Sequence, residues 1–191
     1  MHLVRPTLVS LLLFSLIFGG LYPAFSNLMA AHLFPAQATG SLLLGRDGKP
    51  LGSALIGQNF SQPQYFWGRL SATTPNTYNA SSSGGSNFSV NNPALLDAVK
   101  ARIADLHQAD PANNAPIPVD LVTASGSGLD PEISPAAAAY QIGRVARARG
   151  LSQEVVRALV AQHTQGRQFG LLGEPRVNIL TLNLALDGKQ P

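Results

Sequence analysis

The apolar positions near the start of the chain predict one long membrane helix. The run from Thr7 to Phe25 carries no charge, and apolar residues remain frequent for about nine residues beyond it. At a rise of about 1.5 Å per residue, the uncharged run is just long enough to cross the hydrocarbon core of a bilayer. We therefore expect a short terminus over residues 1–6, a transmembrane helix over 7–34 and a soluble domain over 35–191.

A cleaved signal peptide is the alternative for this segment, with Arg5 as its positive start and Ala24-Phe25-Ser26 as its cleavage site. The uncharged run is longer than the apolar part of a usual signal peptide, which favours a retained anchor. Arg5 and the α-amine precede the run, whereas no Lys or Arg follows it before Arg46. The positive-inside rule then predicts the N-terminus in the cytoplasm and the soluble domain outside.

Shorter apolar runs predict the strands of the soluble domain. The runs Ser41–Leu44 and Leu51–Ile56 flank a polar segment that contains Asp47-Gly48. An Asp-Gly pair between apolar runs is typical of a β-hairpin. A third candidate strand is Ile117–Thr123, and the leucine spacing in Val177–Leu186 fits either a helix or a strand.

Capping residues predict three helices. Asn92 and Ser134 each precede a proline, and these pairs begin helices that run to Gln108 and to Arg149. Gly150 ends the second helix, and Ser152 begins a third. Together the elements predict an α+β domain, in which a short-stranded sheet packs with about three helices.

Two further segments have a distinctive composition. The stretch Ser71–Asn92 is rich in Ser, Asn, Thr and Gly, which predicts a long loop that is either disordered or functional. Tyr65-Phe66-Trp67 is an aromatic cluster. It could anchor a partner, but a place in the domain core is the more common role of such a cluster, and we expect that role here.

Composition excludes several classes of function. The 191 residues suit one domain and an anchor, and the excess of 13 Lys and Arg over 10 Asp and Glu is too small to predict a nucleic-acid interface. The chain has no cysteine, which excludes disulfides, thiolate metal sites and cysteine nucleophiles. The phosphate-binding and dinucleotide-binding glycine motifs are absent, as are the nucleophile elbow and the histidine spacing of a metal site. We therefore expect neither a catalytic residue nor a metal site, and we expect the isolated chain not to be an enzyme.

The close acidic pair Asp130 and Glu132 lies beside a helix start, where helix capping is a better explanation than acid–base catalysis. Just before it stands the turn Ser125-Gly126-Ser127-Gly128, between a predicted strand and a predicted helix. Such a turn can direct backbone N–H groups at a phosphate, with Arg144 and Arg147 as counter-charges. The alternative is a tight structural turn with solvated arginines. This is favoured by the residues alone, because Asp130 would repel an anion.

One stretch resembles a known family. Val119–Ser134, which reads VDLVTASGSGLDPEIS, resembles the signature of the C subunit of bacterial Kdp potassium-transporting ATPases. Further matches in order and spacing are residues 52–58, 65–69, 83–87 and 173–178. The chain departs from the family pattern at Leu70, at Glu132 and over residues 88–90, and the carboxylate of Glu132 disfavours an anion site.

The resemblance implies a non-catalytic accessory subunit of a high-affinity, ATP-driven potassium pump in the bacterial inner membrane. Its implied partners are a channel-like potassium-binding subunit, a P-type ATPase subunit and a small single-span subunit. The family is described as a catalytic chaperone that stabilises the assembly and raises the ATP affinity of the ATPase subunit. On that description, ATP would be shared with the ATPase subunit by Ser125, Gly126, Ser127, Gly128, Gln141 and Arg144.

Three interpretations remain open from the sequence. The periplasmic domain could act in assembly over the external mouth of the channel-like subunit. It could instead contact nucleotide, although the positive-inside rule places the turn on the side of the membrane without ATP. Without the resemblance, the chain could also be an anchored binding protein for a small external ligand.

Overall fold

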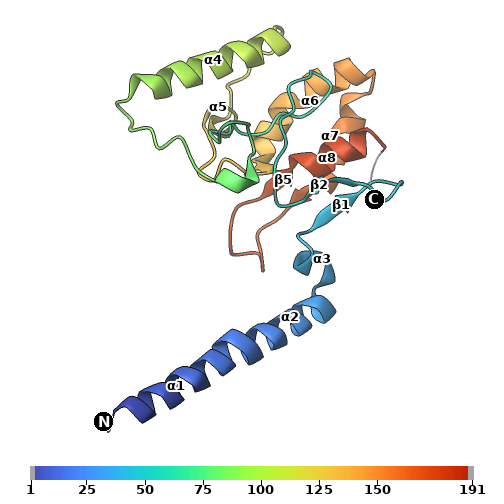
Figure 1. Ribbon diagram of the computed structural model, residues 1–191. Helices are drawn as coiled ribbons and strands as arrows, with labels where there is room; N and C mark the ends of the chain where they lie inside the picture. The colour runs from blue at the N-terminus through green and yellow to red at the C-terminus, as the bar shows by residue number, and fades with distance from the viewer. Residues whose placement is uncertain (1–2, 189–191) are drawn as a thin grey trace. The chain divides into compact units, whose positions relative to one another are not determined.

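The structure is a computed structural model that describes residues 3–188, and the chain divides into two compact units between Leu42 and Leu43. The first unit is a long helix with a short helical turn after it. The second unit contains all of the remaining helices and strands (Figure 1).

One continuous helical stretch runs from Val4 to Leu33 and dominates the first unit. Its middle turn is a π-helix, in which the Tyr22 N–H donates to Ile17 O. Pro23 follows this turn and lacks a backbone N–H, and a widened turn is a common way to accommodate such a residue. The elements are α1 (Val4–Leu16), η1 (Ile17–Leu21), α2 (Tyr22–Leu33) and the short α3 (Pro35–Ala38).

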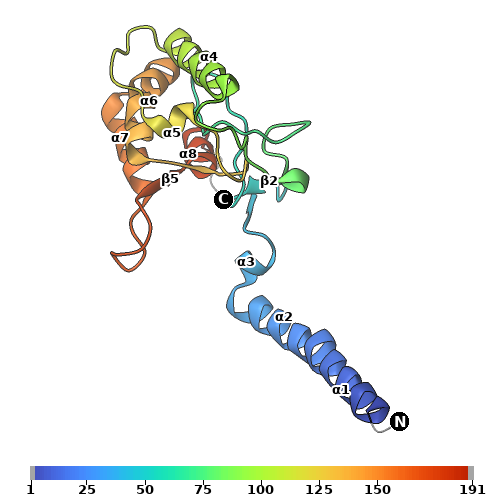
Figure 2. The same ribbon diagram turned by 90° about the vertical axis from the view of Figure 1, so that its left-hand side faces the viewer.

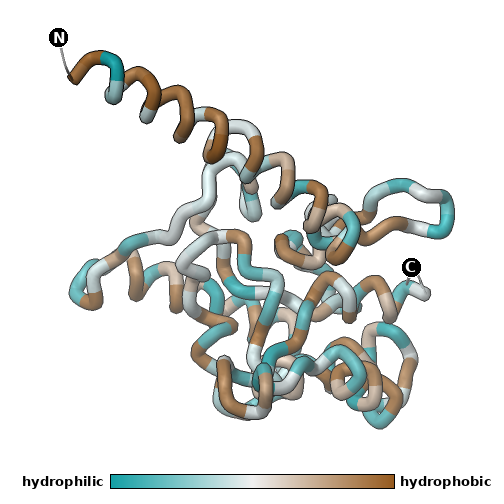
Figure 3. The backbone as a smooth tube through the Cα atoms, turned by 90° about the horizontal axis from the view of Figure 1, so that it is seen from below, coloured by the Kyte–Doolittle hydropathy of each residue, from teal (hydrophilic) through white to brown (hydrophobic). Residues whose placement is uncertain are grey.

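This helix is apolar along most of its length (Figure 3). It has 30 residues, and its most apolar stretch contains no buried residue. By length and composition it is able to cross a membrane, which confirms the predicted N-terminal apolar helix.

The second unit begins with a two-stranded sheet and ends with a three-stranded sheet. The second sheet is antiparallel, with the strand order β3-β5-β4, so that β5 is central. Its register pairs Ile133 and Thr164 with Val177 from opposite sides. The elements in chain order are β1 (Leu42–Leu44), β2 (Pro50–Ser53), η2 (Ala80–Ser82), α4 (Pro93–Ala109), α5 (Val119–Val122), β3 (Glu132–Ile133), α6 (Pro135–Arg149), α7 (Gln153–Gln162), β4 (Thr164–Gln165), β5 (Arg176–Asn178) and α8 (Ile179–Leu186).

The α+β architecture is confirmed, and most predicted elements are present. The hairpin of β1 and β2 forms around Asp47-Gly48, although β2 ends at Ser53 rather than at Ile56. The three predicted caps accept hydrogen bonds from the first turns of their helices, at Ala94 N, Ala137 N and Val155 N.

The predicted strand Ile117–Thr123 is wrong. Its middle forms the single helical turn α5, which follows Pro118, and the Thr123 hydroxyl donates to Val119 O at 2.9 Å. A short apolar run has no periodicity that separates a strand from a buried helical turn. The ambiguous stretch Val177–Leu186 contains both structures, because β5 passes directly into α8 at Asn178.

The core of the second unit lies where α6 packs against α7, with the central strand β5 against α6 and with α8 against α7 (Figures 1 and 2). Phe66 and Trp67 are buried in this core, at 0% and 5% exposure. Two of the three residues of the aromatic cluster are therefore core, as expected, whereas Tyr65 is half-buried and its hydroxyl donates to Asp187 Oδ2 at 3.0 Å. Phe66 and Trp67 share the core with Leu106, Leu121, Ile133, Ala137, Ala138, Ile142, Val145, Ala146, Val156, Val160, Val177, Ile179 and Leu182.

Candidate functional site

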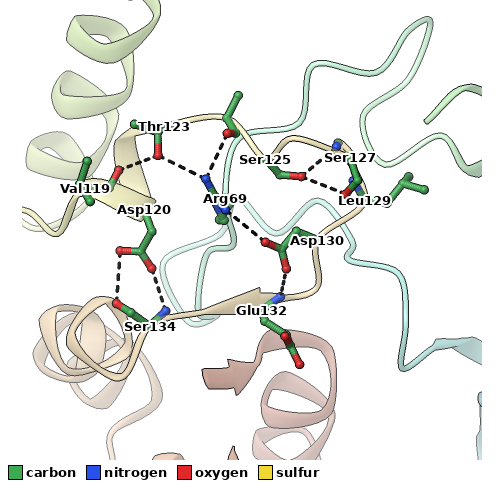
Figure 4. A network of polar contacts seen from close by, with 12 residues as sticks. Arg69, Val119, Asp120, Thr123, Ser125, Ser127, Leu129, Asp130, Glu132 and Ser134 are labelled. Carbon is green, nitrogen blue, oxygen red and sulfur yellow. Dashed lines mark hydrogen bonds and ion pairs between the residues drawn. The ribbon is translucent and has the colours of Figure 1, made fainter. Parts of the chain in front are cut away.

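In the Gly/Ser turn, residues 125–128, the serine side chains accept hydrogen bonds from nearby backbone N–H groups. The Gly128 N–H donates to Ser125 Oγ at 2.8 Å, and the Leu129 N–H donates to Ser127 Oγ at 3.1 Å (Figure 4). The two hydroxyl oxygens lie 3.2 Å apart. An N–H group that is bonded inside its own turn is not free for a phosphate oxygen, so two donors of the predicted anion site are already engaged.

The carbonyl groups of the same turn bind the Ser- and Asn-rich loop. Ser71 Oγ donates to Gly128 O at 2.7 Å. Ser127 O accepts two bonds, from Gly84 N at 2.8 Å and from Ser83 Oγ at 3.0 Å. Ser71, Ser83 and Gly84 of the loop therefore have a structural role, because their hydrogen bonds hold the loop against the turn.

Gly128→Ala is expected to destabilise the domain by about 1–3 kcal/mol, whereas Gly126→Ala is expected to be close to neutral. Gly128 has a φ of 69°, and a Cβ built on it would lie 2.5 Å from Thr73 Cγ2 and 2.7 Å from Gly84 O. A Cβ at Gly126 would meet no atom within 4 Å. Urea unfolding of both variants, followed by the fluorescence of the single tryptophan, measures the difference. Equal unfolding midpoints would contradict the assigned packing.

Arg144 and Gln141 lie on the face of α6 that packs against the core, and their exposed fractions are 4% and 1%. The Arg144 guanidinium donates to Pro63 O at 2.7 Å, to Tyr65 O at 3.0 Å and to Gln141 Oε1 at 2.5 Å. It also lies over the Trp67 ring, 4.6 Å from its centre. Burial lowers the pKa of Arg144 to about 10, so this side chain remains charged at neutral pH.

Two side-chain amides bond to the backbone N–H and C=O groups of Phe66 and Trp67, as a neighbouring strand would do in a sheet. Gln141 accepts from Trp67 N at 2.8 Å and donates to Trp67 O at 3.1 Å. Asn183 of α8 does the same for Phe66, at 2.9 Å and 3.0 Å. The buried backbone of this segment is therefore satisfied by two helices that are far apart in the sequence.

The six residues predicted to bind nucleotide fall into two groups. Ser125, Gly126, Ser127 and Gly128 form one turn, and Ser125 N donates to Leu70 O at 2.9 Å. Gln141 and Arg144 bind each other and the backbone of residues 63–67. The second pair faces the core, so the expectation that Arg144 is solvated is wrong. Contact of these six residues with nucleotide stays a prediction.

Arg147, the second proposed counter-charge, forms an ion pair with Asp110 at the end of α4. The Asp110 side chain is buried, whereas the Arg147 side chain is more than half exposed. This pair ties α6 to the end of α4, and it accounts for Arg147 without a ligand.

Asp130 and Glu132 each pair with an arginine, so their expected role as helix caps is wrong. Asp130 Oδ2 lies 3.3 Å from Arg69 Nη1, and Glu132 Oε1 lies 2.8 Å from Arg176 Nε. Asp130 also accepts from the Glu132 N–H at 3.0 Å, which tightens the chain before β3. Neither carboxylate bonds to the first turn of α6, where Ser134 is the cap.

Arg69 and Asp120 join the turn to its surroundings, and no motif in the sequence predicted a role for either (Figure 4). Arg69 Nη2 donates to Ala124 O at 3.1 Å, just before the turn. Asp120 accepts from Ser134 N at 2.7 Å and from Ser134 Oγ at 3.2 Å. Two signals were present in the sequence: Asp120 is an acidic residue close to the turn, and Arg69 follows the aromatic cluster. Only the fold shows that Arg69 contacts Asp130 and that Asp120 contacts Ser134.

A separate cavity of about 540 Å³ opens beside the three-stranded sheet. Leu43, Leu55 and Leu184 give it an apolar wall, and Gln162 and His163 are among its polar residues. His163 Nδ1 lies 3.2 Å from Thr181 Oγ1, which places the ring between α7 and α8.

The stability of the domain is expected to fall as the pH drops below about 6.5, because burial lowers the pKa of His163 from its ordinary 6.5. The unfolded chain then binds the proton more readily than the folded chain. Stability is fully present above the ordinary pKa and is lost as the pH falls through the lower folded-state value.

Urea midpoints measured at several pH values between neutrality and mild acid test this effect. His163→Gln should flatten the pH dependence in that window. An equal slope in the His163→Gln variant and the parent would show that the pH dependence has another source.

Comparison with known proteins identifies the family. A family model described as "KdpC: K+-transporting ATPase, c chain" matches residues 4–188. The potassium-transporting ATPase KdpC subunit of Methylococcus capsulatus is 62% identical over 183 residues, which cover 96% of each protein. The KdpC subunit of Ralstonia nicotianae is 64% identical over 184 residues, which cover 96% of this chain and 90% of that one. That of Polaromonas naphthalenivorans is 62% identical over 190 residues, which cover 100% of this chain and 96% of that one.

The match takes in every feature described above, from the apolar helix through the Gly/Ser turn to α8. It also confirms the resemblance drawn from the sequence motifs. The chain therefore belongs to the KdpC family of K+-transporting ATPase C chains.

Proposed function

We propose that the chain is a non-catalytic accessory subunit of an ATP-driven potassium uptake pump in the bacterial inner membrane. The observation that carries the proposal is the family match over residues 4–188, which includes the apolar helix as well as the domain. The relatives named above are potassium-transporting ATPase subunits. The partners would be a channel-like potassium-binding subunit, a P-type ATPase subunit and a small single-span subunit.

In this proposal, residues 7–34 cross the membrane, residues 1–6 lie in the cytoplasm and residues 35–191 form a periplasmic domain. The charge asymmetry around the helix supports this orientation, because Arg5 precedes the helix and the next Lys or Arg is Arg46. Membrane lipid then surrounds the apolar side chains of the helix, which the protein itself leaves exposed.

The orientation is tested with a single introduced thiol, since the chain has no cysteine. Val90 is 88% exposed and suits the purpose, because a thiol there should react without disturbing the core. Whole cells that carry Val90→Cys should be labelled by a membrane-impermeant thiol reagent. Labelling that occurs only after lysis would reverse the proposed orientation.

The subunit is proposed to stabilise the assembly and to raise the ATP affinity of the ATPase subunit. Two observations favour an indirect effect on ATP: Arg144 and Gln141 are buried, and the Gly128 and Leu129 N–H groups are bonded inside the turn. Such coupling needs no contact between the subunit and the nucleotide, because it requires only that the two binding events favour the same state of the complex.

Removal of residues 40–191 tests the function, with co-purification of the other subunits, potassium uptake and the apparent KM for ATP as the readouts. We expect loss of assembly, of uptake or of both. Intact assembly with normal uptake and KM would contradict the proposal. Ser127→Ala separates the two routes, because a direct contact predicts a raised KM for ATP in an otherwise stable pump, and an indirect effect predicts no change.

An anchored binding domain for a small external ligand is the second candidate. The cavity beside the three-stranded sheet favours it, because its apolar wall and polar groups are the kind of lining that small-molecule sites have. Failure of the full chain to co-purify with any other membrane subunit would favour this candidate over the pump subunit.

A further inference from the structure

The loop between β4 and β5 exposes three large apolar side chains at its end. Phe169, Leu171 and Leu172 are 85%, 78% and 61% exposed. We call residues Gln168–Leu172 the hairpin tip. Figures 1 and 2 show the loop that carries it projecting away from the helices of the domain. A group of exposed apolar side chains marks a surface that binds something less polar than water.

The backbone of the hairpin tip is closed on itself. The Gln168 N–H donates to Leu172 O at 2.8 Å, and Gln168 O accepts from Leu171 N at 3.1 Å and from Leu172 N at 2.9 Å. The Gly170 N–H donates to Arg167 O at 3.1 Å. Unbonded N–H groups are costly outside water, so a loop that bonds these donors internally is suited to a low-polarity environment.

Charge begins only at the base of the tip. Arg167 Nη2 lies 2.7 Å from both carboxylate oxygens of Glu174, and the tip between them carries no charged residue. Phe169 has a φ of 54°, which is unusual for a bulky residue. A strained position that presents an aromatic side chain to the outside is typical of a functional contact rather than of packing.

The hairpin tip arises at the end of the domain where the chain enters from the anchor. Leu43 and Leu55, from the first hairpin, line the same cavity as Gln165 and Arg176, which begin and end the loop that carries the tip. The linker from Phe34 to Leu42 has nine residues, which reach about 30 Å at most at about 3.5 Å per residue. The linker therefore keeps Leu43 within about 30 Å of the end of the helix.

We propose that the hairpin tip enters the interfacial layer of the bilayer that holds the anchor helix. The three apolar side chains would lie at the boundary of headgroups and acyl chains, and the Arg167–Glu174 pair would lie among the headgroups. The domain then has a second attachment to the membrane, which limits how it turns on its linker. This inference rests on the proposed retention of the anchor, but not on the proposed effect on ATP affinity.

The test uses the full chain in vesicles of phosphatidylethanolamine and phosphatidylglycerol, with a nitroxide label on Phe169→Cys. Val90→Cys is the matched control, because Val90 is an apolar loop residue with an exposure of 88% against 85% for Phe169. Collision rates with oxygen, which concentrates in lipid, and with a water-soluble nickel chelate are compared. We expect the oxygen-to-nickel ratio to be severalfold higher at position 169 than at position 90.

Equal ratios at the two positions would overturn the proposal. The fluorescence of buried Trp67 shows that both labelled variants are folded. The same labels are then measured in the assembled pump, where the high ratio should persist at position 169. Protection from both reagents there would mean that a protein subunit covers the tip, and spin–spin broadening between labels would mean that a second copy does. Either result would overturn the lipid contact. The vesicle measurement does not depend on assembly, so failure of the proposed pump function would be seen separately.

Discussion

Replacement of Arg144 by alanine is expected to lower the free energy of unfolding by about 3–5 kcal/mol. The change removes the donors to Pro63 O and Tyr65 O, so that both carbonyl groups lose a hydrogen bond from a charged group. It also removes one of the two guanidinium groups that lie over the Trp67 ring, leaving that of Arg102, and opens a cavity beside the ring. Because one guanidinium makes all of these contacts, no single neighbour can replace it.

Urea unfolding followed by Trp67 fluorescence measures this loss, since Trp67 is the only tryptophan and contacts Arg144 directly. Arg157→Ala is the matched control, because Arg157 lies exposed on α7 and should cost less than about 0.5 kcal/mol. Arg144→Lys should fall between the two, as it keeps the charge but loses the forked geometry. Unchanged stability with a raised KM for ATP in the pump would instead favour nucleotide contact.

Asn183→Leu is expected to destabilise the domain by about 2–4 kcal/mol, although the two side chains have the same number of heavy atoms and the same branching. Asn183 is 1% exposed, and its amide satisfies both the N–H and the carbonyl group of Phe66. A leucine would bring an apolar surface against these two buried groups. The cost comes from the unpaired backbone, which has no access to water in the folded domain.

Asn114→Leu provides the control, because Asn114 is exposed in the segment after α4 and its replacement should be close to neutral. Thermal or urea unfolding of both variants gives the comparison. Equal stability of Asn183→Leu and the parent would show that Phe66 finds other partners. Gln141→Leu should cost at least as much as Asn183→Leu, since it removes the same pair of bonds from Trp67 and also the acceptor of Arg144.

Arg144 and Asn183 also affect the Gly/Ser turn, although neither touches it. The segment that they hold continues through Arg69 to Leu70, which binds the turn through Ser125 N. Loss of either side chain is therefore expected to loosen the turn as well as the core. A variant at Arg144 with altered pump activity needs its stability measured before any catalytic or nucleotide role is assigned to it.

The sequence by itself determined the features that depend on neighbours a few residues away. The caps Asn92, Ser134 and Ser152 mark their helices correctly, because a capping side chain bonds to an N–H two or three residues later. The hairpin around Asp47-Gly48 and the apolar helix were readable for the same reason, since each depends on local turn chemistry or on composition alone. The family was readable from motifs and their spacing.

Only the tertiary structure decided the rest. The stretch Ile117–Thr123 had strand-like composition, yet Asp120 in its middle bonds to Ser134, 14 residues away, and the chain forms a helical turn there. The turn at Ser125 forms at the predicted residues, but it lies between α5 and β3 rather than between a strand and a helix. Gln141 and Arg144 did not remain surface residues beside it, because their partners lie 74 and 81 residues earlier in the chain. A polar side chain on a helix is equally compatible with solvent and with a buried backbone, and only the fold brings that backbone within bonding distance.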